Sequence, residues 1–338
     1  MGNLRTIITG TGHHLPERIV TNDELAPHLG TTPEWISQRC GIEQRHWVNP
    51  DQSTSEIAHL ASLKALENAK IEAKDLDYII VATVTPDHEF PGTACFLQKR
   101  LEVSGIPALD VRQQCTGFIY GLELADSLIK TGRYKNILFV CSEVHSKCLD
   151  LSEQGRSVSM LFGDGAGAVI IQSSENENPV GILSTSVHAD GSGAKDLWCP
   201  APGTGFNSEN RLNPNMLAEG LHYPHMNGRQ VFVHAVRRMT ETLTTELEKH
   251  GLTVDDPDIF LFHQANIRII DTIGEQLKLP KEKVFNSLQT CGNTTAATIP
   301  IGLDRARLEG KIPKNALIAM TAFGSGYTWG SSLIRWTQ

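Results

Sequence analysis

Hydrophobic residues follow two patterns along the chain, and these patterns alternate from one end to the other. Short apolar runs, such as YIIVATV and IFLF, predict buried strands. Other stretches place apolar residues at helical spacing, as after the capping box at Ser53, which is followed by Ile57, Leu60 and Ala61. Because near-continuous apolar strands alternate with helices, the pattern predicts an α/β fold with buried, largely parallel sheets.

The same order of elements occurs twice. KNILFVCSE from Lys135 and KNALIAMTA from Lys314 are the clearest pair, and four further pairs keep the same order at an offset of roughly 175–181 residues. This repetition indicates an internal duplication. We predict two α/β halves, residues 1–175 and 176–338, packed about a pseudo-twofold axis. A duplication with only a structural role would give the same pattern.

One strand-to-helix joint carries a cysteine. The apolar run at 108–111 ends before Cys115, and a helical pattern then continues to Gly132, a typical residue for ending a helix. The N–H groups and positive dipole end of a helix favour a thiolate, so we expect this position to lower the pKa of the thiol. The alternative is that Cys115 is a small buried hydrophobic residue, the commoner role of a free cysteine.

Polar residues follow corresponding strands of the second half. His263 comes directly after the IFLF strand, and Asn293 lies at the second joint. The duplication brings both joints toward the axis, so we expect His263 and Asn293 to approach Cys115. A half-buried histidine or a helix N-cap asparagine would also explain these residue types. The turn at Gly324 allows the backbone to come close to a substrate and offer an N–H group.

The glycine-rich segment 163–167 has a different interpretation. Its sequence GDGAG lacks the spacing of a dinucleotide-binding loop and is followed by the apolar run AVII. We therefore predict a hairpin turn there.

Composition narrows the class of function. The net charge of −8 argues against broad nucleic-acid binding. No stretch is apolar enough to span a membrane, so we expect a cytoplasmic protein. The seven cysteines show no CxxC spacing, which is typical of reduced thiols and gives no sign of a zinc site.

Several motifs together carry a resemblance to a known family. They are EWISQRCGIEQRH, DHEFPGTAC, the joint at Cys115, FGDGAGAVI, FHQANIRII, CGNTTAATIP and FGSGYTWGSSLIRW. In this order and spacing, the chain resembles the β-ketoacyl-acyl-carrier-protein synthase III family of the thiolase-like superfamily. The resemblance implies two duplicated halves in a five-layered αβαβα arrangement.

The resemblance also implies a mechanism. Cys115, His263 and Asn293 match the catalytic Cys-His-Asn set of the family. Cys115 would take the acyl group of an acyl-CoA, and His263 and Asn293 would stabilise the enolate formed when malonyl-acyl carrier protein loses CO₂. The backbone N–H groups of Cys115 and Ser325 would form the oxyanion hole. No metal or redox cofactor is expected.

The resemblance also assigns individual residues of this chain to substrate binding. Trp35, Arg39 and Arg156 match residues at the adenine and phosphate end of coenzyme A. Asn266 follows the catalytic histidine at the family's spacing. The remaining two matches are Phe90, at the acyl pocket and often contributed across the dimer interface, and Arg268, at the carrier-protein docking surface. The resemblance implies a homodimer.

Three departures from the family pattern leave the primer open. Val233 replaces a lysine of the docking surface, Ser325 interrupts a run of glycines, and the segment 198–225 is long and rich in Pro, Gly and Asn. We expect this segment to shape the acyl entrance. The alternative function is an acyltransferase or a condensing enzyme of secondary metabolism that uses a longer or unusual acyl thioester.

Overall fold

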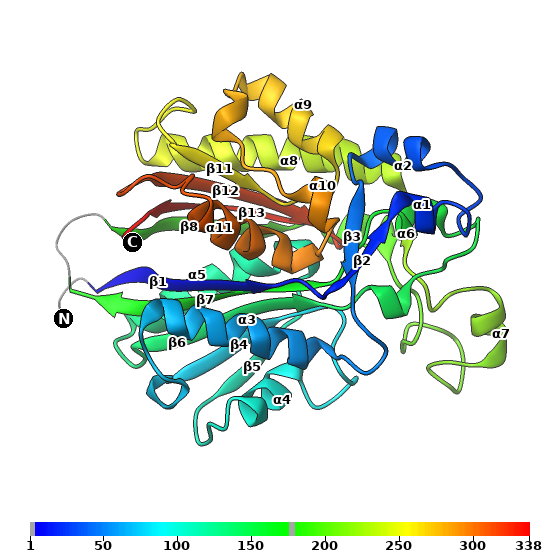
Figure 1. Cartoon of the computed structure of the whole chain (residues 1–338), viewed down its shortest axis with the longest axis horizontal. Helices are drawn as coiled ribbons and strands as arrows, with labels where there is room; N and C mark the ends of the chain where they lie inside the picture. The colour runs from blue at the N-terminus through cyan, green and yellow to red at the C-terminus, as the bar shows by residue number, and fades with distance from the viewer. Residues whose placement is uncertain (1–3, 176–179) are drawn as a thin grey trace.

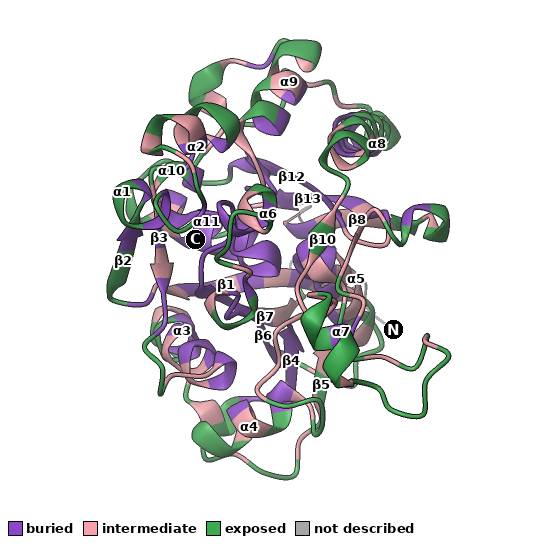
Figure 2. Cartoon of the chain, turned by 90° about the vertical axis from the view of Figure 1, so that its right-hand side faces the viewer, coloured by how far each residue is buried: buried purple, intermediate pink, exposed green. Residues whose placement is uncertain are grey.

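Two β-sheets lie face to face at the centre of the molecule, with helices between them and on both outer sides (Figure 1). The computed structural model describes residues 4–175 and 180–338. Seen from the side, the order of layers is helices, sheet, helices, sheet, helices (Figure 2). The predicted five-layered arrangement of duplicated halves is confirmed. The boundary predicted at residues 175 and 176 touches the segment 176–179, which lies outside the described residues.

The first sheet belongs to the first half of the chain. In spatial order its strands are β1 (Arg5–His14), β7 (Gly165–Ser174), β6 (Asn136–Glu143), β4 (Tyr78–Ala82) and β5 (Ala108–Val111). The second sheet repeats this order with β8 (Gly181–Ala189), β13 (Thr328–Arg335), β12 (Leu317–Gly324) and β11 (Ile259–Phe262). At the position corresponding to β5, the second sheet has only a bridge between Phe260 and Val284.

The prediction of largely parallel sheets is wrong. In the first sheet β4 runs parallel to β5 and β6, but β7 runs antiparallel to both of its neighbours. The second sheet likewise has one parallel pair, β11 with β12, and two antiparallel pairs. The apolar runs reflect burial of both faces by helices, and burial of this kind does not fix the direction of a strand.

Helices cover three surfaces of the sheets. The layer between the sheets contains α5 (Gly117–Lys130) and α11 (Thr298–Leu308), whose buried residues join one core with strands of both sheets. The outer layers contain α3 (Thr54–Ala69) and α4 (Thr93–Arg100) on one side, and α8 (Gly228–Lys249) and α9 (Ile267–Leu277) on the other. The capping box at Ser53 is not formed, because its hydroxyl pairs with Ser55 at 3.3 Å.

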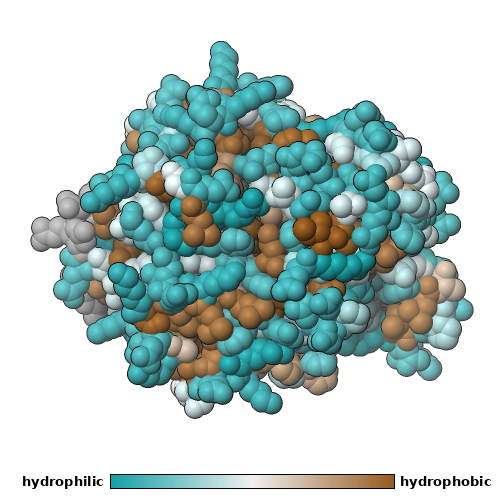
Figure 3. All heavy atoms as spheres, in the orientation of Figure 1, coloured by the Kyte–Doolittle hydropathy of each residue, from teal (hydrophilic) through white to brown (hydrophobic). Residues whose placement is uncertain are grey.

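Smaller elements gather at the end of the molecule where the site lies. They are β2 (Arg18–Thr21), α1 (Asn22–Leu25), α2 (Pro33–Cys40), β3 (Gln44–Trp47), α6 (Arg156–Ser159), β9 (Leu197–Trp198), α7 (Pro214–Ala218), β10 (His225–Met226) and α10 (Leu288–Cys291). The segment with α7 extends from the body at the right of Figure 1. Figure 3 shows a mostly hydrophilic face with apolar side chains at the surface over this segment, where Leu212 and Leu217 are exposed.

Candidate active site

Cys115 lies at the predicted joint between a strand and a helix. It occupies a short 3-10 turn, Gln114–Thr116, between β5 and α5. Gln114 has a positive φ of 42°, so the backbone turns sharply just before the thiol. Only 7% of the Cys115 surface is exposed. The helix ends as predicted, with Gly132 in the left-handed region at a φ of 75°.

The expectation of a lowered pKa at Cys115 is wrong for the free protein. Burial raises the pKa of the thiol to about 12, and the carboxylate of Glu143 adds to this increase. The backbone N–H groups of Cys115 and Ser325 act in the opposite direction by facing the sulfur. The helix start therefore supplies donors, but removal of the thiol from water outweighs them.

The turn after β12 packs directly against the cysteine. A Cβ atom added to Gly324 would lie 3.0 Å from the Cys115 Cβ and 3.1 Å from its backbone nitrogen. Glycine at this position therefore permits the close approach that aims the Ser325 N–H at the sulfur. The Ser325 hydroxyl donates to the Leu197 carbonyl, which ties the turn to β9.

His263 is held by one ring nitrogen and leaves the other without a partner. It follows β11, is 3% exposed, and its Nδ1 lies 2.8 Å from the Thr298 hydroxyl. Among the described residues, its buried Nε2 has no hydrogen-bond partner. Burial lowers the pKa of His263 to about 3, so the imidazole is neutral at physiological pH.

Thr295 connects the polar residues of the second half. Its backbone N–H donates to Asn293 Oδ1 at 2.8 Å, and its hydroxyl lies 2.5 Å from His145 Nε2. Thr295 begins a 3-10 turn, Thr295–Ala297, that contacts the turn carrying Cys115. The two joints thus meet as the duplication predicted. The N-cap of this turn is Thr294 and not Asn293, so the bond to Asn293 lies one residue before the cap.

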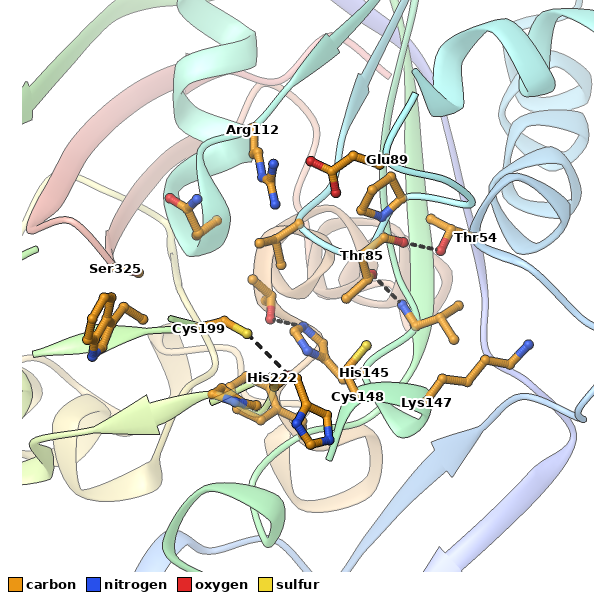
Figure 4. Close-up of a pocket in the computed structure, with 18 of the residues that line it drawn as sticks. Thr54, Thr85, Glu89, Arg112, His145, Lys147, Cys148, Cys199, His222 and Ser325 are labelled. Carbon is orange, nitrogen blue, oxygen red and sulfur yellow. Dashed lines mark hydrogen bonds between the residues drawn. The ribbon is translucent and has the colours of Figure 1, made fainter. Parts of the chain in front are cut away.

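The cavity beside Cys115 has a volume of about 490 Å³. Figure 4 shows side chains from several elements pointing into it. Cys115, Thr295 and Ser325 line its inner end, whereas His263 and Asn293 are not among the lining residues. The segment 198–225 supplies part of the wall through Trp198, Cys199, Ala201, Pro202, His222 and Pro224.

Sequence reasoning missed a buried acid beside this cavity. Glu143, at the end of β6, accepts from the Thr85 hydroxyl at 2.8 Å and from the Val84 N–H at 3.1 Å. Burial raises the pKa of Glu143 to about 8. His145, two residues further on, lines the cavity and stacks on Phe162 with ring centroids 4.4 Å apart. Polar residues at the end of the apolar run ILFVC were the signal available in the sequence.

The predicted coenzyme A residues form a second cluster. Arg39 and Arg156 both stack on Trp35, with guanidinium carbons 5.2 and 5.7 Å from ring centroids. Asn266 Nδ2 donates to the Arg39 carbonyl at 3.1 Å, and Arg268 Nη2 donates to the Gln38 carbonyl at 3.1 Å.

Phe90 and Val233 lie at the surface rather than at the cavity. Phe90 is 81% exposed and is absent from the residues that line the cavity of its own chain. Val233, on α8, is 52% exposed.

The glycine-rich segment 163–167 does not form the predicted hairpin. Its preceding element is α6, and Gly165 already belongs to β7. The buried Asp164 carboxylate accepts from the backbone N–H groups of Val48 and Ser146. Asp164 therefore joins separate segments, whereas a hairpin needs a strand on each side of the turn.

No group of three or more His, Cys, Asp or Glu residues within 4–175 and 180–338 is arranged to hold a metal ion. In the same part of the chain, no helix is both long and apolar enough to cross a membrane.

The stacked, duplicated sheets define the class of this protein, which has the thiolase-like fold. Residues 109–191 match the family model for 3-oxoacyl-[acyl-carrier-protein] synthase III, and residues 247–336 match the model for its C-terminal part. The chain belongs to the β-ketoacyl-acyl-carrier-protein synthase III family.

Individual relatives extend this match over nearly the whole chain. The β-ketoacyl-acyl-carrier-protein synthase III of Caldanaerobacter subterraneus is 43% identical, over 98% of this chain and 98% of its own length. The synthase of Xanthomonas campestris is 41% identical over 97% and 98%. The crystal structure of 3-oxoacyl-acyl-carrier-protein synthase III from Aquifex aeolicus superimposes with a TM-score of 0.88 at 41% identity, covering 98% of this chain and 100% of that chain.

Proposed function

We propose that this protein joins an acyl group from acyl-CoA to malonyl-acyl carrier protein with loss of CO₂, and so initiates fatty acid biosynthesis. Family membership supports the reaction type. The observation that carries the assignment is a buried thiol facing two backbone N–H groups. The same arrangement that stabilises a sulfur anion can stabilise a carbonyl oxygen as it becomes negative.

In the first step Cys115 receives the acyl group. Its sulfur attacks the thioester carbon, the bond to the coenzyme A sulfur breaks, and the thiol proton of Cys115 leaves with the coenzyme A thiol. The N–H groups of Cys115 and Ser325 are the proposed donors to the tetrahedral oxyanion. Loss of one such donor costs about 3–4 kcal/mol in typical transition states.

In the second step His263 and Asn293 act on the malonyl thioester. Its C–CO₂ bond breaks, and the electron pair passes into an enolate whose oxygen accepts hydrogen bonds from His263 Nε2 and Asn293 Nδ2. The enolate carbon then attacks the acyl group on Cys115, and the cysteine sulfur leaves and regains a proton. The product is a β-ketoacyl thioester.

The hydroxyl of Thr298 bears on which ring nitrogen of His263 carries the hydrogen. The Thr298 hydroxyl lies 2.8 Å from His263 Nδ1 and 3.0 Å from the Thr295 carbonyl. This carbonyl already accepts the backbone N–H of Thr298. A carbonyl oxygen accepts two hydrogen bonds, so the single hydroxyl hydrogen can go to the Thr295 carbonyl or to Nδ1. The proposed donor role of His263 requires that it go to Nδ1, so that the neutral ring carries its own hydrogen on Nε2.

The second cluster fits the polar end of coenzyme A. Trp35 is the proposed stacking partner of adenine, which would take the place of a guanidinium that now lies over its ring. Arg39 and Arg156 carry charges suited to phosphate. Arg268 is the proposed contact for an acidic carrier protein. Val233 replaces a lysine there, so we expect the docking to depend less on charge.

We further propose that the protein works as a cytoplasmic homodimer and needs no metal or redox cofactor. Phe90 supports the dimer. It follows the cavity-lining residue Glu89 and is 81% exposed, and an exposed aromatic side chain of this kind is suited to a subunit interface. The proposed reaction forms and breaks only thioester, C–C and C–CO₂ bonds. Each step is accounted for by the side chains and backbone donors named above.

The comparisons do not favour the alternative of an acyltransferase or a condensing enzyme of secondary metabolism that uses a longer or unusual acyl thioester. Incubation with malonyl-acyl carrier protein and acyl-CoAs of graded length tests the choice. A condensing enzyme releases one CO₂ for each β-ketoacyl product. Release of CO₂ without a β-keto product would contradict the proposal.

A further inference from the structure

His145 is a buried polar residue of the cavity wall that the proposed mechanism does not use. It lies two residues after β6, is 7% exposed, and lines the cavity together with Thr295 (Figure 4). Burial lowers the pKa of His145 to about 3, so its ring is neutral at physiological pH. A neutral imidazole keeps the same hydrogen-bonding capacity over this pH range, which suits a role in holding neighbouring groups in place.

One contact of His145 leads to the side chain of Asn293 through Thr295. His145 Nε2 lies 2.5 Å from the Thr295 hydroxyl, and the backbone N–H of Thr295 donates to Asn293 Oδ1 at 2.8 Å. Because an N–H must meet an oxygen, this bond fixes which end of the Asn293 amide is which. Within the described residues Asn293 Nδ2 has no hydrogen-bond partner, so it is left to donate to a ligand.

The backbone of Thr295 is strained. Its φ of 51° lies in the left-handed region, which a β-branched residue adopts only where its surroundings hold it there. The turn that carries Cys115 has the same feature at Gln114, with a φ of 42°. There the next residue is the nucleophile, whereas Ala296 follows Thr295. What the strained conformation provides in the second half is an N–H directed at Asn293.

A second contact of His145 leads to the main chain of Asn293 through Phe162. The rings of His145 and Phe162 stack with their centroids 4.4 Å apart, and Phe162 forms a parallel bridge with Asn293. In this bridge the Asn293 N–H donates to the Leu161 carbonyl at 2.9 Å, and the Gly163 N–H donates to the Asn293 carbonyl at 3.1 Å. The contacts of His145 thus reach both the backbone and the side-chain amide of Asn293.

We propose that His145 is a positioning residue for the decarboxylation step. Acting through Thr295 and Phe162, it holds the Asn293 amide so that Nδ2 donates to the enolate oxygen as this oxygen becomes negative. The proposal rests on the proposed function, because it concerns the malonyl thioester on which Asn293 acts.

The test removes the polar contact from either side. His145→Leu removes the ring, and Thr295→Val removes only the hydroxyl and keeps the branched Cβ. Acetylation of Cys115 by acetyl-CoA is followed by intact-protein mass spectrometry, and kcat and KM are measured for CO₂ release from malonyl-acyl carrier protein. We expect kcat to fall on the order of tenfold in both variants, with KM and the acetylation rate within about twofold. His145→Gln, whose amide can bond the Thr295 hydroxyl, should retain most of the CO₂ release.

A double variant shows whether His145 acts through Asn293. His145→Leu should lower CO₂ release in the wild-type background but leave the residual CO₂ release of Asn293→Ala unchanged, because the group that it positions is already absent. His250→Leu is the matched control. His250 Nε2 lies 2.7 Å from the Ser184 hydroxyl, and His250 does not line the cavity, so this variant also loses a histidine–hydroxyl contact and should keep both rates.

The outcomes separate this proposal from the proposed function. Unchanged CO₂ release in His145→Leu would contradict the positioning role, and so would equal losses of acetylation and CO₂ release, which would show a structural role. A further tenfold loss in the Asn293→Ala background would contradict the route through Asn293. Should His145→Leu fail to fold, unchanged CO₂ release in Thr295→Val would contradict the proposal. Absence of both CO₂ and a β-ketoacyl product in the wild type would contradict the proposed function itself.

Discussion

Burial controls the protonation of the side chains around Cys115. It raises the pKa of the thiol to about 12 and of Glu143 to about 8, and it lowers the pKa of His263 to about 3. All three groups are therefore held toward their neutral forms. At this scale the chemistry depends on where individual hydrogens lie, and two residues outside the catalytic set allow this to be tested.

The first prediction concerns Thr298. Thr298→Val removes the hydroxyl that, in the proposed mechanism, donates to Nδ1 and so keeps the hydrogen of His263 on Nε2. We expect CO₂ release from malonyl-acyl carrier protein to fall about 10- to 100-fold, as for a lost transition-state donor, while acylation of Cys115 stays within about twofold. Thr298→Ser should restore activity. Unchanged CO₂ release in Thr298→Val would contradict the role given to this hydroxyl.

The second prediction concerns Glu143 and pH. Its pKa is raised from 4.5 to about 8 in the folded protein, so the folded state binds the proton more tightly between these values. Glu143 therefore destabilises the fold increasingly as pH rises through this window. Relative to the wild type, Glu143→Gln should gain on the order of 3 kcal/mol between pH 5.5 and 8.5 in urea unfolding. A difference independent of pH would contradict the buried, protonated carboxyl.

At the scale of elements, the turn after β12 positions the second backbone donor. Gly324→Ala would place a methyl group 3.0 Å from the Cys115 Cβ and displace this turn. We expect acylation of Cys115 to slow by at least about tenfold. Gly274→Ala in α9, where no atom lies within 4 Å of the added carbon, is the control and should leave the rate unchanged. Normal acylation in Gly324→Ala would contradict the role of this turn in positioning the backbone donor.

Periodicity predicted most helices and strands because it records burial. The strands β4 and β11 and the helices α3 and α5 lie where apolar spacing placed them, and the repeated segments KNILFVCSE and KNALIAMTA form the corresponding strands β6 and β12. Strand direction and the connection at 163–167 were predicted wrongly, because both depend on long-range pairing. The high pKa of Cys115 was also not predictable, since it depends on packing from the other half of the chain.

At the scale of the molecule, duplication explains how distant residues reach one site. It predicted that the segments of His263 and Asn293 approach Cys115, and the contact between the turns Gln114–Thr116 and Thr295–Ala297 agrees with this for the Asn293 segment. It said nothing about Glu143, His145 or Arg112. The position of these residues beside the cavity follows from the three-dimensional packing and not from the repeated order of elements.

The edge of the first sheet supports a further prediction about assembly. Among the described strands, β5 pairs only with β4, and Leu109 on it is 37% exposed. An open edge with apolar side chains is suited to pairing with a second copy. We expect light scattering to give twice the chain mass of 37.1 kDa. Leu109→Asp should shift the protein toward the monomer, and a monomeric wild type would contradict this assembly.

The central claim is that Cys115 carries the acyl group while His263 and Asn293 act on the malonyl thioester. Peptide mass spectrometry after incubation with acyl-CoA tests it most directly. The acyl group should be found on Cys115 in the wild type, His263→Ala and Asn293→Ala. Only the wild type should lose it to malonyl-acyl carrier protein with release of CO₂. An acyl group on Cys291 or Cys95, with Cys115 unmodified, would contradict the account.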